Sequence, residues 1–598
     1  MNIPFITVAD AMRHWSKVKP DAPALKAPGA EDMSYFELVQ QLEKTSIQLA
    51  ELGYGADHRL ALVLPQSILL ASALLSLTAS CPVLPVNAAW SAAEQSAIFK
   101  KADVRALVTL PGFAESARTA AAELNLPVIE IIPSSGMPTG LFSLSGSPAV
   151  ECDTSVMQPD SLALILPTSG TTGRQKLVPI SGQQLANSAA YMQEIMFLTP
   201  DDRTLVMGSL NLLAAIGFCL LATVVSGGTS VIAPFDPLQV ISQVEHYKPT
   251  WFFTSPPMLH HIYEYLRTHP IPAAFKAMRF IRVSSAPFPA DKIVTLEQWL
   301  GIPIIHGYGM TEGISNNICN PLPPKVRKPE TVGLPVHVQV AVVDEDGRQL
   351  PPGEVGELAM RGDNIFTGYL NPEDNIPSPF YNGWFMTGDL ASIDSDGYVT
   401  IAGRRKEMIN SGGLKILPRE VEEACMSHPE VAEACVVPLP HPTLGEQVAA
   451  AVVHRSDALT ESELASHLKN SLSQYKVPSA IFFVDKLPNS AGGKIQRQQV
   501  IKQLTDLINR QASPVTGAEP IDEITSKILL LWHDLLGTAA VSPVDQFISS
   551  GGDSLTAARL ALRISETFGV DFSVLDIFDF PSPASQAAEV NNRLTTII

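Results

Sequence analysis

The sequence has few of the features that mark metal-binding, disulfide-linked or nucleic-acid-binding proteins. Its six cysteines show no CxxC spacing: Cys81, Cys152, Cys219, Cys319, Cys425 and Cys435. Neither a zinc site nor a disulfide framework is indicated, and we predict a reducing, cytoplasmic location. Basic residues are also scarce, since 41 Lys and Arg stand against 60 Asp and Glu and give a formal charge of −19. Because no local basic patch offsets that charge, we predict no nucleic-acid partner.

Long hydrophobic runs are scarce as well. The opening segment, MNIPFITVADAMRHW, lacks the cationic start and apolar run of a secretory signal. The most apolar stretch, residues 210–225, has roughly 16 residues, fewer than the about 20 that a membrane-spanning helix needs. Its Asn211 and Gly217, and the Gly227-Gly228 pair just after it, favour a buried helix. We therefore predict no membrane span.

Hydrophobic residues make up 46% of the 598-residue chain, enough to fill several cores. Over residues 1–402, short apolar runs at 59–64, 161–167 and 229–235 alternate with segments of helical period. This alternation is typical of a large α/β domain with doubly wound sheets. From about residue 352 the pattern changes to short β-like pieces divided by turns.

The remainder of the chain divides into two smaller parts. Residues 403–510 contain an amphipathic helix at 418–428 and a buried strand at 433–440, which predicts an α+β domain. Residues 511–519 are small, polar and proline-containing, as linkers are. Residues 520–598 carry three helical patterns, at 523–536, 554–568 and 582–594, and more acidic than basic residues. They predict a small acidic helical bundle.

A loop rich in glycine and hydroxyl groups follows the apolar run at 161–167. Backbone N–H groups freed by glycine can surround phosphate oxygens, hydroxyls add donors, and a lysine adds charge. The lysine is placed too late for the Walker pattern. The ATP-binding candidates in this loop are Thr168, Ser169, Gly170, Thr171, Thr172, Gly173 and Lys176.

These residues, TSGTTGRQK, resemble the signature loop of the adenylate-forming superfamily, with Gln175 in place of a proline. That superfamily includes acyl-CoA synthetases, firefly-type luciferases and peptide-synthetase adenylation domains. Further blocks follow in the family's order over roughly residues 20–505: SSAPF (284–288), HGYGMTE (306–312), TVGLP (331–335), GELAMRG (356–362), GYLNPE (368–373), GWFMTGDL (383–390), GRRKEMINSGG (403–413) and NSAGGKIQR (489–497). With the residue patterns, the resemblance implies a large α/β domain with a small β-barrel, then an α+β domain.

The resemblance also implies the residues of an ATP site. Tyr308 would stack on adenine, and Thr311 would bind the α-phosphate. Glu312 would hold Mg²⁺, a hard cation that prefers oxygen ligands. Asp389 would accept hydrogen bonds from the ribose hydroxyls, and Arg404 would reach the ribose or a phosphate.

Other matched positions belong to a second domain that rotates between two half-reactions. Lys494 corresponds to the lysine that contacts the substrate carboxylate and the α-phosphate, so it joins Thr311 and Glu312 as a predicted catalytic residue. Lys406 matches the hinge. Gly412 and Gly413 would line the channel for a pantetheine arm.

The C-terminal bundle carries GGDSL at residues 551–555, which resembles the attachment site of peptidyl carrier domains. Ser554 would therefore carry 4′-phosphopantetheine, with the phosphodiester at the positive end of a helix. The partners implied are a phosphopantetheinyl transferase and a downstream synthase or condensation partner. The acidic surface of a four-helix-type carrier bundle would suit basic patches on both.

The residues expected around the substrate argue against an α-amino acid. Amino-acid-activating relatives carry an aspartate at the position that aligns with Ala214, and a buried α-ammonium without a partner would be costly. The same stretch also lacks the histidine that CoA ligases often have there. A roomy, mostly apolar pocket for a fatty, aryl or hydroxy acid is predicted, and its lining would be Ala214, Ala215, Phe218, Ser255, Ser284, Ser285, His306 and Gly307.

The resemblance implies a ligase that joins a carboxylic acid to AMP, with ATP and Mg²⁺, and then transfers the acyl group to the phosphopantetheine of its own Ser554. Such an enzyme would be a loading unit for polyketide or nonribosomal peptide biosynthesis. Three alternatives share the same blocks: an acyl-CoA ligase that releases a free thioester, a luciferase-like oxygenase, and an inactive scaffold that only docks a carrier.

Overall fold

The computed structural model describes residues 5–134, 139–153, 155–168, 175–314, 317–441, 444–455, 459–488, 495–511, 522–536, 541–547, 550, 552 and 554–596. The chain forms two compact units. The first comprises residues 1–408, 417–435 and 485–498, and the second comprises residues 409–416, 436–484 and 499–598.

A seven-stranded sheet forms the first layer of the first unit. Its central strands are parallel, and an antiparallel strand pairs at each edge. The order is β7 (Phe142–Gly146), β6 (Val128–Pro133), β5 (Ala106–Thr109), β3 (Leu60–Leu62), β4 (Val83–Pro85), β8 (Leu162–Pro167) and β9 (Leu177–Ser181). Parallel central strands are buried on both faces, which explains the continuous apolar runs in the sequence.

A nine-stranded sheet forms the second layer, again parallel in its centre and antiparallel at its ends. The order is β16 (Leu334–Pro335), β15 (Ile318–Cys319), β14 (Ile304–Tyr308), β13 (Phe280–Val283), β12 (Trp251–Thr254), β10 (Arg203–Val206), β11 (Thr229–Ile232), β1 (Pro23–Lys26) and β2 (Met33–Ser34). The predicted doubly wound α/β class is confirmed, with mixed rather than wholly parallel sheets.

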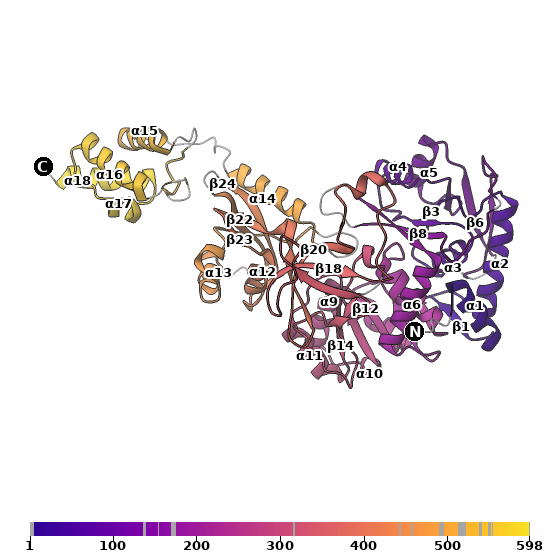
Figure 1. Cartoon of the computed structure of the whole chain (residues 1–598). Coiled ribbons are helices and arrows are strands. Elements are labelled where there is room, and N and C mark those ends of the chain that lie inside the picture. The colour runs from indigo at the N-terminus through magenta and orange to yellow at the C-terminus, as the bar shows by residue number, and fades with distance from the viewer. Residues whose placement is uncertain are drawn as a thin grey trace. The chain divides into compact units, whose positions relative to one another are not determined.

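Helices cover these sheets (Figure 1). Helix α3 is buried along its whole length, whereas helices such as α2 and α6 begin at a serine that closes a capping box with the residue three positions on. The helices of the large domain are α1 (Val8–Val18), α2 (Tyr35–Glu51), α3 (Ile68–Leu77), α4 (Ala92–Lys101), α5 (Glu115–Glu123), α6 (Gly182–Met196), η1 (Ala214–Leu221), α7 (Ala222–Val225), α8 (Val240–Tyr247), α9 (Pro256–Thr268), α10 (Ala273–Lys276), α11 (Ala290–Leu300) and η2 (Thr311–Gly313).

The apolar stretch at residues 210–225 is mostly buried, as predicted, but half of it is a π-helix rather than an α-helix. Residues Ala214–Leu221 form the π-helix η1, and α7 continues from it. Within the described part of the chain, no helix is long and apolar enough to cross a membrane.

The β-like pieces after residue 335 form a five-stranded antiparallel sheet that curls into a half-barrel. Its strands are β17 (Gln339–Val343), β18 (Gly356–Arg361), β19 (Phe380–Tyr381), β20 (Trp384–Ile393) and β21 (Val399–Arg404). The smaller α+β part contains η4 (Arg405–Glu407), α12 (Pro418–Met426), α13 (Glu461–Lys469), α14 (Arg497–Gln511), and a sheet of β22 (Ile409–Ser411), β23 (Leu414–Ile416), β24 (Val431–His441), β25 (Gly445–His454) and β26 (Ala480–Phe483). The helix predicted at 418–428 and the strand at 433–440 are confirmed.

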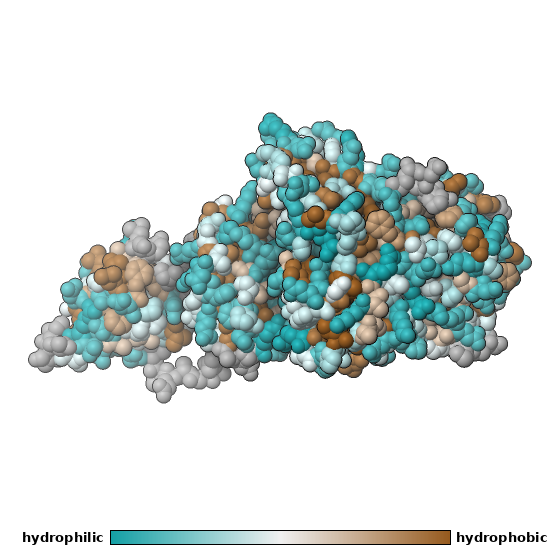
Figure 2. Space-filling view, turned by 90° about the horizontal axis from the view of Figure 1, so that it is seen from below, coloured by the Kyte–Doolittle hydropathy of each residue, from teal (hydrophilic) through white to brown (hydrophobic). Residues whose placement is uncertain are grey.

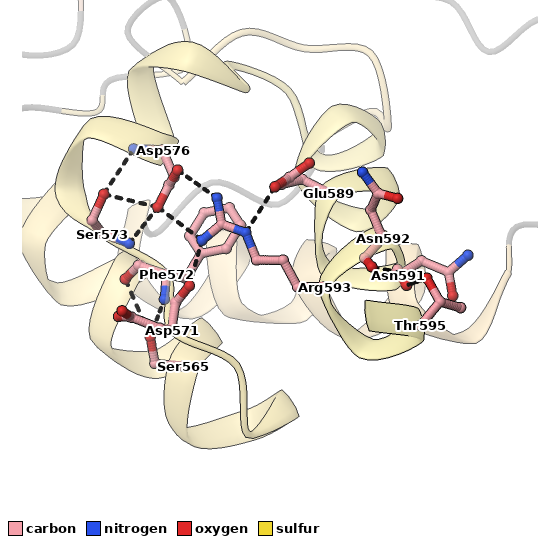
Figure 3. A network of polar contacts seen from close by, with 10 residues as sticks. All are labelled: Ser565, Asp571, Phe572, Ser573, Asp576, Glu589, Asn591, Asn592, Arg593 and Thr595. Carbon is pink, nitrogen blue, oxygen red and sulfur yellow. Dashed lines mark hydrogen bonds and ion pairs between the residues drawn. The ribbon is translucent and has the colours of Figure 1, made fainter. Parts of the chain in front are cut away.

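The C-terminal bundle has four helices in the residues that the structure describes: α15 (Glu523–Leu536), α16 (Ser554–Phe568), α17 (Val574–Asp579) and α18 (Pro583–Thr596). Arg593 connects the last two helices (Figure 3). Its guanidinium pairs with Asp576 at 2.7 Å and with Glu589 at 2.7 Å. This pairing lowers the pKa of Asp576 to about 2. The Arg593 ion pair with Asp576 therefore holds α17 against α18. No long periodic pattern in the sequence predicts this short helix.

The surface in Figure 2 is mainly hydrophilic, with apolar residues in small groups. Burial also separates the cysteines: Cys152 is exposed, whereas the other five are buried. Burial raises the pKa of the Cys219, Cys425 and Cys435 thiols to about 12. Since the thiolate is the nucleophile, these buried groups are poor reactants.

We expect a thiol reagent to label one cysteine rapidly in the native chain lacking phosphopantetheine, and peptide mapping to identify it as Cys152. The Cys152→Ser variant should lose the fast phase, and denaturant should release the remaining five thiols. Fast labelling of two or more cysteines in the folded, unsubstituted chain would contradict the burial described above.

We expect Trp532→Ala to destabilise the C-terminal bundle by about 3–5 kcal/mol. Trp532 is fully buried, donates to Gln586 at 2.8 Å and meets the Phe547 ring edge-on. Hydrogen exchange in the intact chain should accelerate strongly over α15 and α16. Leu530→Ala is the matched control on the same helix, because Leu530 is 69% exposed, and it should change exchange little.

Candidate functional site

Three polar side chains meet where β14 ends beside β20 and β21. Asp389 is buried on β20, directly opposite Arg404 on β21, and the two form an ion pair at 3.1 Å. Tyr308, the last residue of β14, donates its hydroxyl to Asp389 at 2.5 Å. Burial and the Asp389 carboxylate hold the pKa of Tyr308 well above its usual range, so the phenol stays protonated. The three residues predicted to bind adenosine are therefore brought together.

Thr311 and Glu312 lie on η2, three and four residues beyond Tyr308. Glu312 is buried and accepts a hydrogen bond from Tyr369 at 2.9 Å. Burial raises the pKa of this carboxyl group above its usual range. A buried carboxylate that forms no ion pair with a described residue fits the oxygen-rich coordination of Mg²⁺.

Lys176 directly precedes β9 and interacts electrostatically with Glu312. Its ammonium group donates to the Asp374 carbonyl at 3.0 Å and lies 4.2 Å from the centre of the Tyr369 ring. Burial lowers its pKa, while Asp374 and Glu312 act in the opposite direction. Tyr369 thus contacts both the lysine and the carboxylate, a connection that the sequence did not predict.

Only the two ends of the predicted phosphate loop are described. Thr168 and Lys176 close it, because each donates a backbone N–H to the other residue. At the adjacent position, Lys101 donates to the Gln175 carbonyl at 2.5 Å and pairs with Asp374 at 2.7 Å. Ser169, Gly170, Thr171, Thr172 and Gly173 lie outside the described residues, and so does Lys494.

The predicted acyl-pocket residues come from four segments of the nine-stranded layer. Ala214, Ala215 and Phe218 lie on η1, Ser255 lies directly before α9, and Ser284 and Ser285 follow β13. His306 and Gly307 lie on β14. π-Helices are rare and occur frequently at functional sites.

Two of these residues have unusual local properties. Ser285 has a φ of 82°, which side-chain-bearing residues rarely adopt, so the SSAPF turn is strained at that position. Burial, together with the Arg419 cation, lowers the pKa of His306 to about 4. His306 is therefore neutral at physiological pH, and its place in the pocket wall stays a prediction.

The structure adds a residue to this region that the sequence analysis missed. Arg282 lies on β13, is fully buried, and has its guanidinium carbon 5.8 Å from the centre of the Phe218 ring. The signal was present in the sequence: an arginine inside the apolar strand pattern FIRV (280–283). Arginine is almost never fully buried unless it has a partner. A charged group therefore lies beside one of the residues predicted to line the mostly apolar pocket.

The predicted hinge residue Lys406 lies in η4, next to Glu407. Arg497 pairs with Glu407 at 2.9 Å and with Glu422 at 2.5 Å, which ties the start of α14 to this short segment. In the second unit, Gly412 and Gly413 have φ values of 59° and 90° and form the turn between β22 and β23. A Cβ on Gly412 would lie 2.9 Å from Leu444.

Ser554 is the first residue of α16. The turn before it needs glycine, because a Cβ on Gly552 would lie 2.4 Å from the Phe547 ring. The Gly552 N–H also donates to the Phe547 carbonyl at 2.9 Å. This turn fixes the start of the helix, whose free N–H groups favour a phosphodiester.

Family comparisons match three successive parts of the chain. Residues 12–370 match the AMP-binding enzymes, residues 420–494 match the AMP-binding enzyme C-terminal domain, and residues 526–590 match the phosphopantetheine attachment site.

Several characterised proteins are similar over most of the chain. An oxalate–CoA ligase of Arabidopsis thaliana is 30% identical over 84% of this chain and 99% of its own, and a sulfoacetate–CoA ligase of Cupriavidus necator is 32% identical over 81% and 95%. The crystal structure of ATP-bound MatB from Rhodopseudomonas palustris is 28% identical and superposes with a TM-score of 0.75, covering 83% of this chain and 99% of that one. The chain therefore belongs to the AMP-binding enzyme family, as an adenylate-forming acid–thiol ligase that carries a C-terminal phosphopantetheine attachment domain.

Proposed function

We propose that this enzyme activates a carboxylic acid without an α-amino group and loads it onto the phosphopantetheine of its own Ser554, as the loading unit of a polyketide or nonribosomal peptide pathway. The observation that carries the proposal is the phosphopantetheine attachment domain fused behind an AMP-binding enzyme. The functional domains that we propose are residues 1–402 and 403–510 for adenylation, 511–519 as linker, and 520–598 as carrier.

In the first half-reaction, a carboxylate oxygen of the acid attacks the α-phosphorus of ATP and pyrophosphate leaves. Asp389 and Arg404 would bind the ribose, Tyr308 would stack on adenine, and Thr311, Lys176 and the 168–173 loop would bind phosphate oxygens. Glu312 would hold Mg²⁺, which neutralises charge on the phosphates. Lys494 would contact both reacting groups.

In the second half-reaction, a thiol sulfur attacks the acyl carbon and AMP leaves. A phosphopantetheinyl transferase would first attach the prosthetic group to Ser554, and that group supplies the thiol. Rotation about Lys406 would replace Lys494 with the Gly412-Gly413 turn, where the absence of side chains allows close approach of the arm.

The absence of an α-amino group rests on Ala214, which offers no carboxylate to an ammonium. The similarity to enzymes for oxalate and sulfoacetate supports the same conclusion, because neither acid has an amino group. Each of these acids carries a second acidic group.

We expect intact-mass analysis of the pantetheinylated enzyme, given ATP, Mg²⁺ and a pool of acids, to find one acyl group on the chain. Ser554→Ala should abolish both pantetheinylation and acyl loading, yet retain acid-dependent exchange of pyrophosphate into ATP. Ser550→Ala, four residues earlier, is the matched control and should load normally. Covalent loading that persists in Ser554→Ala would remove the carrier from the reaction.

The alternatives predict different products from the same reaction mixture. Release of a free CoA thioester at a rate above that of carrier loading would favour an acyl-CoA ligase. Light or CO₂ from the adenylate under oxygen would favour a luciferase-like oxygenase. Failure of pyrophosphate exchange with every acid would favour an inactive scaffold.

We expect Asp389→Asn to lower kcat/KM for ATP by about 10- to 100-fold, because hydrogen bonds to a charged group contribute about 1.5–3 kcal/mol. Pyrophosphate exchange at varied ATP measures the change. Asp396→Asn is the control on the loop that follows the same strand, because Asp396 is 67% exposed, and it should leave kcat/KM unchanged. Equal effects of the two variants would argue against a ribose contact.

A further inference from the structure

Arg282 is a fully buried cation with unmet hydrogen-bonding capacity. Its only described side-chain acceptor is the weak Met192 sulfur, at 3.7 Å from Nη1. Nε and Nη2 have no hydrogen-bond partner within the part of the chain that the structure describes. An arginine has five N–H donors, so most of its capacity is unused.

No described residue supplies a compensating negative charge. The nearest ionisable groups are the Cys219 and Cys319 thiols, and burial raises the pKa of both, to about 12 for Cys219. Both are therefore neutral at physiological pH. Burial in turn lowers the pKa of Arg282, although arginine remains protonated in proteins. A buried, unpaired guanidinium costs several kcal/mol, so a ligand that supplied a negative charge here would bind favourably.

The side chain lies on the face of β13 that belongs to the acyl-pocket region. Its neighbours Ile281 and Val283 pack into the core on the opposite face, among the helices α8 to α11. Side chains alternate along a strand, so Arg282 and Ser284 share the other face. Phe218 on η1, a predicted pocket residue, lies beside the guanidinium at 5.8 Å.

We propose that Arg282 binds a second anionic group on the substrate acid, a carboxylate or a sulfonate, and thereby selects short dianionic acids. This inference rests on the proposed adenylation and names its substrate class. The planar guanidinium can hold such a group through two parallel N–H···O bonds. A dianionic acid would supply the charge that the buried cation lacks.

The spacing also limits the length of the acid. Along an extended backbone, the Cα atoms of Arg282 and Ser284 are about 6.6 Å apart, because the two residues are two positions apart in the chain. If the reacting carboxylate lies near the serine turn, the second anionic group lies a few bonds away. We therefore expect acids with a short carbon backbone rather than long-chain fatty acids.

Acid-dependent exchange of pyrophosphate into ATP tests the inference, because it reports the first half-reaction alone. The dianionic probes are oxalate, malonate, succinate and sulfoacetate, and the monoanionic probes are acetate, butyrate, hexanoate and benzoate. The native enzyme should prefer one or more dianionic acids. Arg282→Met should lower kcat/KM for these acids by roughly 100- to 1,000-fold, with no comparable loss for monoanionic acids.

Two further variants separate substrate binding from a structural role. Arg282→Lys keeps the positive charge and should retain more activity toward dianionic acids than Arg282→Met. Arg267→Met is the control, since Arg267 is 54% exposed on α9 and should behave as the native enzyme does. An equal loss for all acids in Arg282→Met and Arg282→Lys would overturn the inference.

The native enzyme alone also decides the question if the variants do not fold. A preference of the native enzyme for monoanionic acids would overturn the role of Arg282 and leave the proposed adenylation intact. Absence of exchange with every acid would instead overturn the proposed function, and this inference with it.

Discussion

The hydrogen bond from Tyr308 to Asp389 joins two sheets on which the nucleotide site depends. Tyr308 ends a strand of the nine-stranded sheet, whereas Asp389 belongs to the antiparallel sheet that also carries Arg404. A displacement of either sheet would separate these groups. The Tyr369 hydroxyl makes a similar connection to Glu312, and its ring lies beneath Lys176. Tertiary packing therefore holds the polar groups at fixed positions, which reduces the reorganisation needed when charge develops on phosphate.

The buried charged groups of this region differ in whether they have a partner of opposite charge. Asp389 has Arg404 as a partner, so its charge is balanced inside the protein. Glu312 accepts a hydrogen bond from a phenol but forms no ion pair within the described residues, and burial raises its pKa although Arg404 acts in the opposite direction. Arg282 has neither an acidic partner nor a good acceptor there. A buried charge without an ion-pair partner destabilises the free enzyme. Binding of a ligand with the opposite charge therefore stabilises such a group more than it stabilises one that is already paired.

The sequence predicts the fold class well because alternating apolar runs and helical patterns depend on local periodicity. It does not predict the π-helix at Ala214–Leu221, since an apolar stretch looks alike in α and π geometry. The six-residue helix α17 is too short for a periodic signal. The ATP-site residues came from family blocks, but the position of Tyr369 between Lys176 and Glu312 requires the fold. Arg282 precedes the SSAPF block by two residues, so no family block marks it.

The charge of the acyl pocket links the two parts of the proposed specificity. Amino-acid-activating relatives place an aspartate where this chain has Ala214, and that carboxylate suits a cationic substrate group. In this chain that negative charge is missing. Phe218 lies on η1 four residues after Ala214, and the buried cation Arg282 lies beside its ring. Both differences shift the pocket in the same direction, against an ammonium and toward an anion. A neutral His306 adds no charge of either sign. On the proposed assignment, Arg282 therefore gives the acyl pocket its positive charge.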